Sequence, residues 1–276
     1  MRRSLRARSR DFGLEWIPAG LELLVRLRLI LIDNESMRLA PKGEVVDIWI
    51  VDLSVAEQTL QRAQTVLSED ELQRSRRFRF PVDCRRFVMA RANLRRILAS
   101  YLHVAGQTLV FDYSEYGKPT LSRPQSQMRF NVSRSGERAL IACTQGREVG
   151  VDIEKERQDI EIDDLAKRFF TAPENAKLQA FPLPDRYQAF LRCWTCKEAF
   201  VKAVGRGLSL GLDKFDVSLG IGEPGSGGAT STEKFSVDGW SLSPIVSNTL
   251  EGYISAAAVE GAGIELRVRT PDEIPG

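Results

Sequence analysis

The sequence predicts an α+β protein built from two similar lobes. The first observation is its order of elements: a hydrophobic strand, a long helix and a group of short strands follow one another twice. The second is a faint internal repeat, since Arg76-Arg-Phe78 precedes the first long helix and Lys167-Arg-Phe-Phe170 precedes the second. We therefore expect an N-terminal lobe over residues 45–145 and a C-terminal lobe, which carries the metal site, over residues 146–270.

Residues 1–44 are treated as a separate N-terminal extension. Their first ten positions are rich in arginine, and the apolar stretch 21–32 is interrupted by two arginines. Charges inside an apolar stretch argue against a signal peptide and against a membrane span. The first convincing strand follows shortly after Met37, which is a second candidate start. We expect the extension to be disordered or not native.

The first lobe begins with a buried strand at Val45–Leu53, which is rich in β-branched and aromatic residues. Ser68-Glu-Asp-Glu71 matches a capping box and predicts the start of a helix. A longer helix follows Pro81, because apolar side chains recur there at helical spacing up to Tyr101. Short strands are expected at residues 108–113, 128–132 and 139–144.

The second lobe begins with a strand at Glu148–Glu154. Helices are then expected at residues 162–170 and 185–204, and strands at residues 214–219, 239–242, 253–259 and 264–268. The loop 220–236 is rich in glycine and serine, and Gly220–Gly225 fits the dinucleotide-binding pattern G-x-G-x-x-G. That pattern requires a helix to begin at once, but Pro224 and more glycines are found instead. No nucleotide role is predicted for this loop.

The overall charge is nearly balanced, with 39 Lys and Arg against 37 Asp and Glu, but the charges are unevenly distributed. Arginines are concentrated at residues 74–96 and acids at residues 148–164. This pattern suits a site that holds a polyanion and a metal, although two solvated helix faces would also produce it. Four cysteines in a chain this long do not indicate a disulfide framework, so a cytoplasmic location is expected. We expect neither a nucleic acid nor a membrane as a partner.

Two carboxylates are predicted to share one face of the strand at 148–154. Side chains alternate across a strand, so Asp152 and Glu154 point the same way, about 7 Å apart. Carboxylates this close repel each other unless a cation or water separates them. A solvated acidic strand face is the alternative interpretation.

A third carboxylate, Glu198, interrupts the apolar stripe of the second long helix. A carboxylate on a buried face is costly unless it is paired or bound to a metal. Lys202 is four residues further on, so a simple helical ion pair is the alternative interpretation. Three carboxylates without a nearby histidine favour Mg²⁺ over zinc, and the coordination of Mg²⁺ is commonly completed by substrate phosphates.

The Cys193–Cys196 pair lies inside a helix and has no second pair, so redox or zinc chemistry is not predicted for it.

The segment Val149–Glu154, VGVDIE, followed by Trp194–Lys202, WTCKEAFVK, resembles the two-part signature of the 4′-phosphopantetheinyl transferases. Further matches, including those to the surfactin-synthetase-type branch, are Tyr116-Gly-Lys-Pro119, Phe130-Asn-Val-Ser133, Gly205–Leu210 and Leu212–Val217. The resemblance covers roughly residues 46–260. It implies two similar α/β lobes in a pseudo-twofold arrangement within one monomeric chain.

The resemblance also implies an activity. Such enzymes transfer the 4′-phosphopantetheine arm of coenzyme A to a serine of an apo acyl or peptidyl carrier protein, with Mg²⁺, and release 3′,5′-ADP. By match to the motif, Asp152, Glu154 and Glu198 would bind the metal. Glu198 would also be the catalytic base, and Lys202 would bind the pyrophosphate and assist the leaving group.

The resemblance assigns further residues to coenzyme A. Arg74 and Arg86 match basic positions that bind its phosphates, and Lys197, beside Glu198, is assigned to the same substrate. The wall around the adenine and its 3′-phosphate is matched by Tyr116, Gly117, Lys118, Pro119 and Ser133. Arg134 stands where the family commonly has histidine. Because arginine is always charged and can bind phosphate through two hydrogen bonds, we expect phosphate binding with less pH dependence.

Two other functions are compatible with these residues. Another magnesium-dependent phosphotransferase or a phosphodiesterase would use the same carboxylates without requiring coenzyme A. A non-catalytic protein that binds coenzyme A or docks a carrier is the second alternative, but it would not need Asp152, Glu198 and Lys202. Fatty-acid, polyketide and nonribosomal-peptide carriers all stay open as acceptors.

Overall fold

The computed structural model of the chain describes residues 41, 43–157, 161–217 and 235–274. These residues belong to one compact unit. Nearly all of the N-terminal extension and the glycine pattern at Gly220–Gly225 lie outside the described residues. No helix of the described part is long and apolar enough to cross a membrane.

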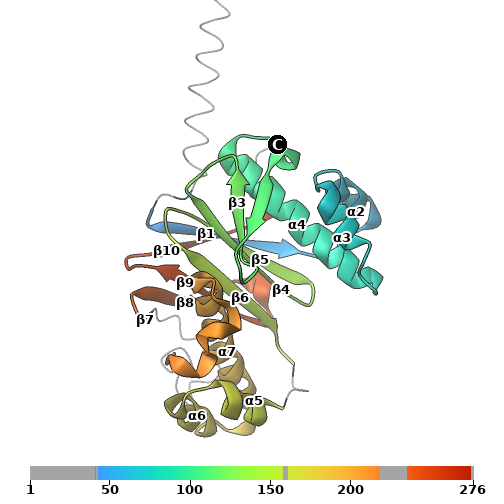
Figure 1. The fold of residues 1–276 in the computed structure, drawn as a ribbon. Coiled ribbons are helices and arrows are strands. Elements are labelled where there is room, and N and C mark those ends of the chain that lie inside the picture. Colours follow the sequence, from blue (N-terminus) through green and yellow to red (C-terminus); the bar gives the residue numbers. More distant parts are fainter. Residues whose placement is uncertain (1–40, 42, 158–160, 218–234, 275–276) are drawn as a thin grey trace, which may run out of the picture. The chain divides into compact units, whose positions relative to one another are not determined.

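The first lobe has the predicted elements in their predicted order, and in addition a helix at Glu57–Gln64 and a strand at Pro119–Arg123 that were not predicted (Figure 1). Its elements are β1 (Val45–Asp52), α2 (Glu57–Gln64), α3 (Glu69–Ser75), α4 (Pro81–Leu102), β2 (Val110–Tyr113), β3 (Pro119–Arg123), β4 (Met128–Ser135) and β5 (Arg138–Gln145). The Glu71 carboxylate accepts a hydrogen bond from the Ser68 backbone N–H, as the predicted capping box requires.

The second lobe has a similar order of helices and strands. Its elements are β6 (Val149–Lys155), α5 (Ile162–Phe169), α6 (Ala172–Gln179), α7 (Leu183–Val204), β7 (Phe235–Val237), β8 (Trp240–Pro244) and β9 (Tyr253–Glu260). The strand predicted at residues 214–219 is not found in its described part, where the chain makes a 3-10 turn at Leu212–Lys214.

The sheet topology confirms the repeat that the sequence predicted. One sheet has the strand order β10-β1-β5-β4 and another has the order β6-β9-β8-β7. Antiparallel pairing joins β1 to β5 and β5 to β4, and it joins β6 to β9 and β9 to β8 in the same way. In each lobe two short helices precede a helix of 22 residues. The α+β fold with two similar lobes is therefore present.

The last strand corrects the expected composition of the lobes. Strand β10 (Glu265–Arg269) lies within the range assigned to the second lobe, yet it pairs in parallel with β1 of the first lobe. Asp47 of β1 explains this placement, because the Arg267 and Arg269 guanidiniums donate to its fully buried carboxylate. The chain thus returns to the first sheet after it has built the second.

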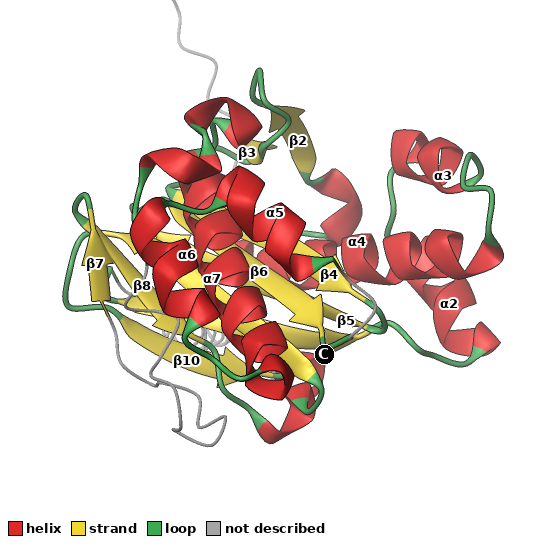
Figure 2. Ribbon diagram, turned by 90° about the horizontal axis from the view of Figure 1, so that it is seen from below, coloured by secondary structure: helices red, strands yellow, loops and turns green. Residues whose placement is uncertain are grey.

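Helix α7 lies directly on β6 because Gly150 has no side chain. A Cβ atom on Gly150 would be 2.1 Å from the Ala199 carbonyl oxygen and 2.3 Å from the Ala203 nitrogen. Ala199 and Ala203 are fully buried, so small residues on both sides bring the helix backbone against the strand. Figure 2 shows α7 lying across the face of this sheet. The contact sets the position of Glu198 and Lys202 relative to β6.

Candidate functional site

The buried carboxylate of Asp152, on β6, joins residues from three elements. Its Oδ1 accepts hydrogen bonds from Lys202 Nζ of α7 at 2.6 Å and from Ser133 Oγ of β4 at 2.8 Å. Lys202 Nζ also donates to Ser133 Oγ at 3.0 Å. Burial raises the pKa of Asp152, and the Lys202 ammonium opposes that shift only in part. Asp152 of the strand and Lys202 of the helix, both predicted as site residues, are therefore in direct contact.

Glu154 lies on the same face of β6 and is half-buried. Its Oε2 accepts a hydrogen bond of 2.9 Å from Ser135 Oγ of β4. Burial and the negative charge of Asp152 raise the pKa of Glu154. The two strand carboxylates are thus close enough to repel each other, as their alternate positions predicted.

Glu198, on α7, completes the group of three predicted acids. Burial raises the pKa of Glu198, Asp152 and Glu154 raise it further, and Lys202 lowers it. Among the described residues, no group of three or more His, Cys, Asp or Glu side chains is arranged so that it could hold a metal ion. An ion here would need additional ligands, and Mg²⁺ usually obtains them from water and phosphate.

A cavity of about 260 Å³ lies between Glu198 and Lys202 of α7 and the predicted adenine wall. Its lining residues are Tyr116, Gly117, Lys118, Pro119, Asn131, Val132, Glu198, Val201, Lys202, Gly205 and Gly207. The Tyr116–Pro119 turn precedes β3, whereas Glu198 and Lys202 lie on α7. Residues far apart in the sequence, predicted to contact one ligand, therefore surround one cavity.

Lys118 has a more internal position than the predicted ligand contact implies. Its Nζ donates to Glu148 Oε2 at 2.6 Å and to the Ala203 carbonyl oxygen at 2.7 Å. The ammonium thus ties the Tyr116–Pro119 turn to the end of α7 and to the residue before β6. In this structure Lys118 shapes the cavity wall, and its charge is already compensated by Glu148.

Two of the three predicted arginines lie over the ring of Phe87 on α4, and the charge of the third, Arg86, acts on one of them. The Arg74 and Arg134 guanidiniums lie 5.4 and 6.0 Å from the ring centroid. Desolvation and then the charge of Arg74 lower the pKa of Arg134, and Arg86 contributes to the same shift. Arg86 Nη2 is 2.5 Å from Glu137 Oε1. The positive charges are therefore close together, as expected for a phosphate site.

Lys197 lies outside the predicted ligand site. Its side chain is completely buried and forms an ion pair of 2.8 Å with the buried Glu174. Its Nζ also donates to the carbonyl oxygens of Leu212 at 2.6 Å and Phe215 at 2.8 Å. Adjacent residues on a helix point about 100° apart, so Lys197 faces away from the cavity that Glu198 lines. Because all three partners lie inside the second lobe, Lys197 stabilises the packing of that lobe.

Two buried atoms of the predicted site have no hydrogen-bond partner within the described structure. They are Asp152 Oδ2 and Arg86 Nε. An unpaired buried polar group costs about 1–3 kcal/mol, so both atoms favour a ligand. A carboxylate oxygen fits a cation and a guanidinium N–H fits a phosphate. The residues present therefore fit the implied magnesium ion and the implied phosphates.

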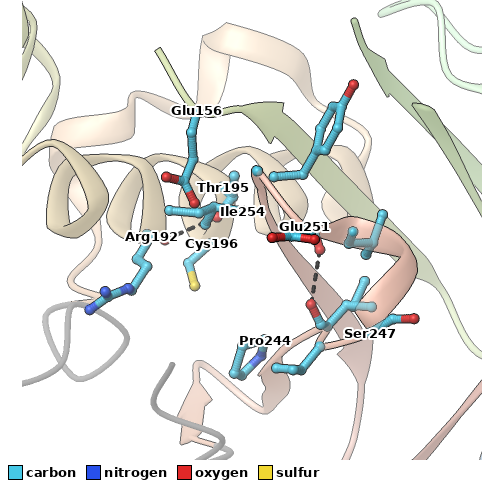
Figure 3. Close-up of a pocket in the computed structure, with 14 residues that line it drawn as sticks. Glu156, Arg192, Thr195, Cys196, Pro244, Ser247, Glu251 and Ile254 are labelled. Carbon is cyan, nitrogen blue, oxygen red and sulfur yellow. Dashed lines mark hydrogen bonds between the residues drawn. The ribbon is translucent and has the colours of Figure 1, made fainter. Parts of the chain in front are cut away.

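A second cavity, of about 200 Å³, lies beside α7 and the start of β9 (Figure 3). It is lined by Arg192, Thr195 and Cys196 of α7, by Glu156, and by residues 244–247 and 250–255. Burial raises the pKa of Cys196 to about 12, so this thiol is protonated at neutral pH and is a poor nucleophile. None of the predicted site residues lines this cavity.

Sequence reasoning missed the polar face of β4. Asn131, Ser133 and Ser135 alternate along the strand, and all three make contacts with β6: Asn131 Oδ1 accepts from the Val151 N–H at 3.0 Å. Only Ser133 was assigned, and to the adenine and 3′-phosphate wall. The alternation of Asn, Ser and Ser in a strand next to an acidic strand is a signal that could have revealed this contact.

Two family models match the chain one after the other. The model described as 4′-phosphopantetheinyl transferase, N-terminal, matches residues 54–146, and the model of the 4′-phosphopantetheinyl transferase superfamily matches residues 148–245.

Curated relatives agree with the family models. The 4′-phosphopantetheinyl transferase HetI of Nostoc sp. (strain PCC 7120) is 37% identical over 223 residues, which cover 80% of this chain and 90% of HetI. The 4′-phosphopantetheinyl transferase Sfp of Bacillus subtilis (strain 168) is 31% identical over 169 residues, 61% of this chain and 74% of Sfp. These matches confirm the resemblance. The chain belongs to the 4′-phosphopantetheinyl transferase superfamily, in its Sfp-like branch.

Proposed function

We propose that this enzyme transfers the 4′-phosphopantetheine arm of coenzyme A to a serine of an apo acyl or peptidyl carrier protein, depends on Mg²⁺ and releases 3′,5′-ADP. The observation that carries the proposal is the shared cavity. Glu198 and Lys202 border it on one side, where Lys202 also donates to Asp152, and the Tyr116–Pro119 turn borders it on the other. A pyrophosphate next to an adenine requires this pairing of groups.

Asp152, Glu154 and Glu198 would hold the magnesium ion. When bound, the ion would neutralise the pyrophosphate and polarise the phosphoryl group that is transferred. The unpaired Asp152 Oδ2 supports this assignment, because a buried carboxylate oxygen without a donor is an available ligand.

Glu198 is the proposed base. It accepts the proton of the carrier serine while the serine oxygen forms a bond to the phosphorus of the phosphopantetheine arm. The bond from that phosphorus to the bridging oxygen breaks, and 3′,5′-ADP leaves with the electron pair. The environment that raises the pKa of Glu198 brings it closer to working pH, where a general base is most effective.

Lys202 and the arginines would bind the charges of coenzyme A. Lys202 is part-exposed at the cavity and is positioned to donate to the pyrophosphate, where it would stabilise the leaving group. Arg74, Arg86 and Arg134 would bind the other phosphate through charge-assisted hydrogen bonds. The unpaired Arg86 Nε supports this role.

Both halves of the proposed site come from one chain, which supports a monomeric enzyme. β4 and the Tyr116–Pro119 turn belong to the first lobe, and β6 and α7 belong to the second. We propose a cytoplasmic enzyme whose partners are coenzyme A and the carrier, without a nucleic acid or a membrane. The carrier can come from fatty-acid, polyketide or nonribosomal-peptide synthesis.

Mass spectrometry of a carrier tests the proposal. The chain is incubated with coenzyme A, Mg²⁺ and an apo carrier protein, and the expected result is a carrier heavier by one phosphopantetheine. A carrier whose acceptor serine is replaced by alanine is the matched control and gains nothing. Cleavage of coenzyme A without any carrier would instead indicate a phosphodiesterase, and coenzyme A binding without any product would indicate a binding protein.

A further inference from the structure

The two lobes meet at two edge strands that are joined by side chains. β4 ends one four-stranded sheet and β6 ends the other, and the described structure has no backbone ladder between them. Figure 1 shows the two strands next to each other. Asn131, Ser133 and Ser135 of β4 reach across to β6 in place of a ladder. The acids of β6 are therefore held from the opposite lobe.

The spacing on the two strands matches. Ser133 donates to Asp152 and Ser135 donates to Glu154, so two serines two residues apart meet two acids two residues apart. Both strands run in the same direction at this junction, since the order of partners is the same on each. Each of the two acids of β6 that are proposed to bind the metal thus has its own hydroxyl donor.

The Ser135 hydroxyl has a fixed orientation. Its oxygen accepts a hydrogen bond of 3.1 Å from the backbone N–H of Lys155. A hydroxyl has one hydrogen, and here that hydrogen is left for Glu154 Oε2 at 2.9 Å. Two bonds to consecutive residues of β6 therefore hold one carboxylate oxygen of Glu154 in place.

We propose that Ser135 is a positioning residue, whose hydroxyl fixes the Glu154 carboxylate beside Asp152. The inference rests on the proposed function and deepens it. Removing a group that orients a metal-binding carboxylate commonly lowers metal affinity or activity by about 10–100-fold. Ser133 is a poorer test of this effect, because it also contacts Lys202.

Substitutions at Ser135 separate the hydroxyl from the shape of the side chain. Ser135→Thr keeps the hydroxyl, whereas Ser135→Val has nearly the same shape as threonine without it. Ser135→Ala removes the group altogether. Ser122→Ala is the matched control, because the Ser122 hydroxyl donates to the Val110 carbonyl inside the β2–β3 hairpin.

The readout is binding of Mn²⁺, a hard cation that carboxylates and water bind in the same way as Mg²⁺. Free Mn²⁺ is followed by electron paramagnetic resonance during titration of the full chain with coenzyme A present and no carrier. We expect Mn²⁺ affinity about tenfold lower in Ser135→Ala and Ser135→Val, and near-native affinity in Ser135→Thr and Ser122→Ala. If Ser135→Ala does not fold, comparing the Mn²⁺ affinities of Ser135→Thr and Ser135→Val tests the role of the hydroxyl.

Three results would overturn the inference: native Mn²⁺ affinity in Ser135→Val, an equal loss in Ser122→Ala, or no Mn²⁺ binding by the native chain. Failure of the proposed function has a different signature. In that case the native chain binds Mn²⁺ in a Ser135-dependent way but no carrier gains mass, so the role of Ser135 would stand and the assigned reaction would not.

Discussion

Glu198 is the residue at which the two proposed roles of the site coincide, since it would bind the metal and accept the serine proton. We expect Glu198→Gln to lower kcat for carrier modification by about 10²–10⁴-fold, the usual contribution of a general base. In the absence of metal we expect its Tm to equal or exceed that of the native chain. The substitution removes a carboxylate that Asp152 and Glu154 repel.

Transfer kinetics and thermal unfolding, measured on the same preparations, check this expectation. Glu251→Gln is the control, because Glu251 is exposed and lies at the other cavity. A near-native kcat for Glu198→Gln would remove Glu198 from the mechanism. A large fall in Tm would show that the residue stabilises the fold instead.

Arg134 predicts how coenzyme A binding depends on pH. Arginine keeps its charge across the working range, so KM of the native chain should change little between about pH 6 and pH 8. In Arg134→His the imidazole, ordinarily with a pKa near 6.5, would lose its charge as pH rises through that range. The positive charges of Arg74 and Arg86 would lower that pKa further.

We therefore expect KM of Arg134→His for coenzyme A to match the native value best at low pH and to rise with pH. Steady-state kinetics at several pH values measure it, with Arg134→Lys as the control that keeps a charge. Parallel pH profiles for the native chain and Arg134→His would contradict a contact between residue 134 and phosphate.

Single residues also mark the limit of prediction from sequence. Asp152, Glu198 and Lys202 could be assigned because strand alternation and helical spacing determine which way each side chain points. Lys197 could not be assigned in the same way. Its burial depends on Glu174, which lies on another helix. Ser135 was missed because its contact crosses between two sheets, and no local pattern encodes which edge strands meet.

At the scale of elements, the close approach of α7 to β6 places the helix residues of the site. Gly150→Ala would put a methyl group 2.1 Å from the Ala199 carbonyl oxygen, so the helix must move. Overpacking of this kind costs about 1–3 kcal/mol or more. We expect a lower Tm and a loss of transfer activity larger than the stability loss explains, because Glu198 and Lys202 move with the helix.

Activity at a temperature where the variant is fully folded separates the two effects. Gly43→Ala is the matched control, because a Cβ atom there would meet nothing within 4 Å. Native activity in folded Gly150→Ala would mean that the site tolerates displacement of α7.

A second prediction at this scale concerns the junction of α3 and α4. The buried Glu71 carboxylate of α3 forms ion pairs with Arg91 and Arg95 of α4. Burial alone would raise the pKa of Glu71, but the hydrogen bond from Arg95 and the two positive charges outweigh burial and lower it. This pairing therefore stabilises the fold above the unfolded pKa, near 4.5, and the stabilisation is lost as pH falls through the lower folded pKa.

We expect the native Tm to fall steeply below about pH 4.5. Glu71→Gln should be less stable at neutral pH, because it leaves two arginines without their anion, and should lose less on acidification. Calorimetry at several pH values, with the exposed Glu69→Gln as the control, measures the difference. Equal acid sensitivity of the native chain and Glu71→Gln would contradict the assignment.

At the scale of the whole molecule, the sequence predicted the repeat and missed how the lobes are joined. The repeat was visible because each lobe has its own strand and helix periodicity. The return of β10 to the first sheet has no such signal, since a parallel pair between residues 45–49 and 265–269 depends on the complete topology. Its physical cause is buried charge, which periodicity does not report.

That charge leads to a prediction for the whole chain. The fully buried Asp47 accepts hydrogen bonds from Arg267 Nε at 2.5 Å, from Arg269 Nε at 3.1 Å and from the Tyr101 hydroxyl at 2.5 Å. A buried carboxylate that loses its cations costs about 3–5 kcal/mol. We therefore expect Arg267→Gln with Arg269→Gln to lower the free energy of unfolding by about that amount in urea. Because β10 links the end of the chain to the first sheet, both lobes should still unfold in one transition.

Adding Asp47→Asn to the two arginine substitutions distinguishes buried charge from lost packing. If the destabilisation arises from an unpaired carboxylate, the neutral amide removes most of the penalty and the triple variant is more stable than the double variant. If it arises from the stacking of Arg269 on Trp49, whose ring centroid is 5.4 Å away, Asp47→Asn restores nothing. Recovery would show that one buried carboxylate in the first strand holds the last strand, and with it the chain's return from the second lobe to the first.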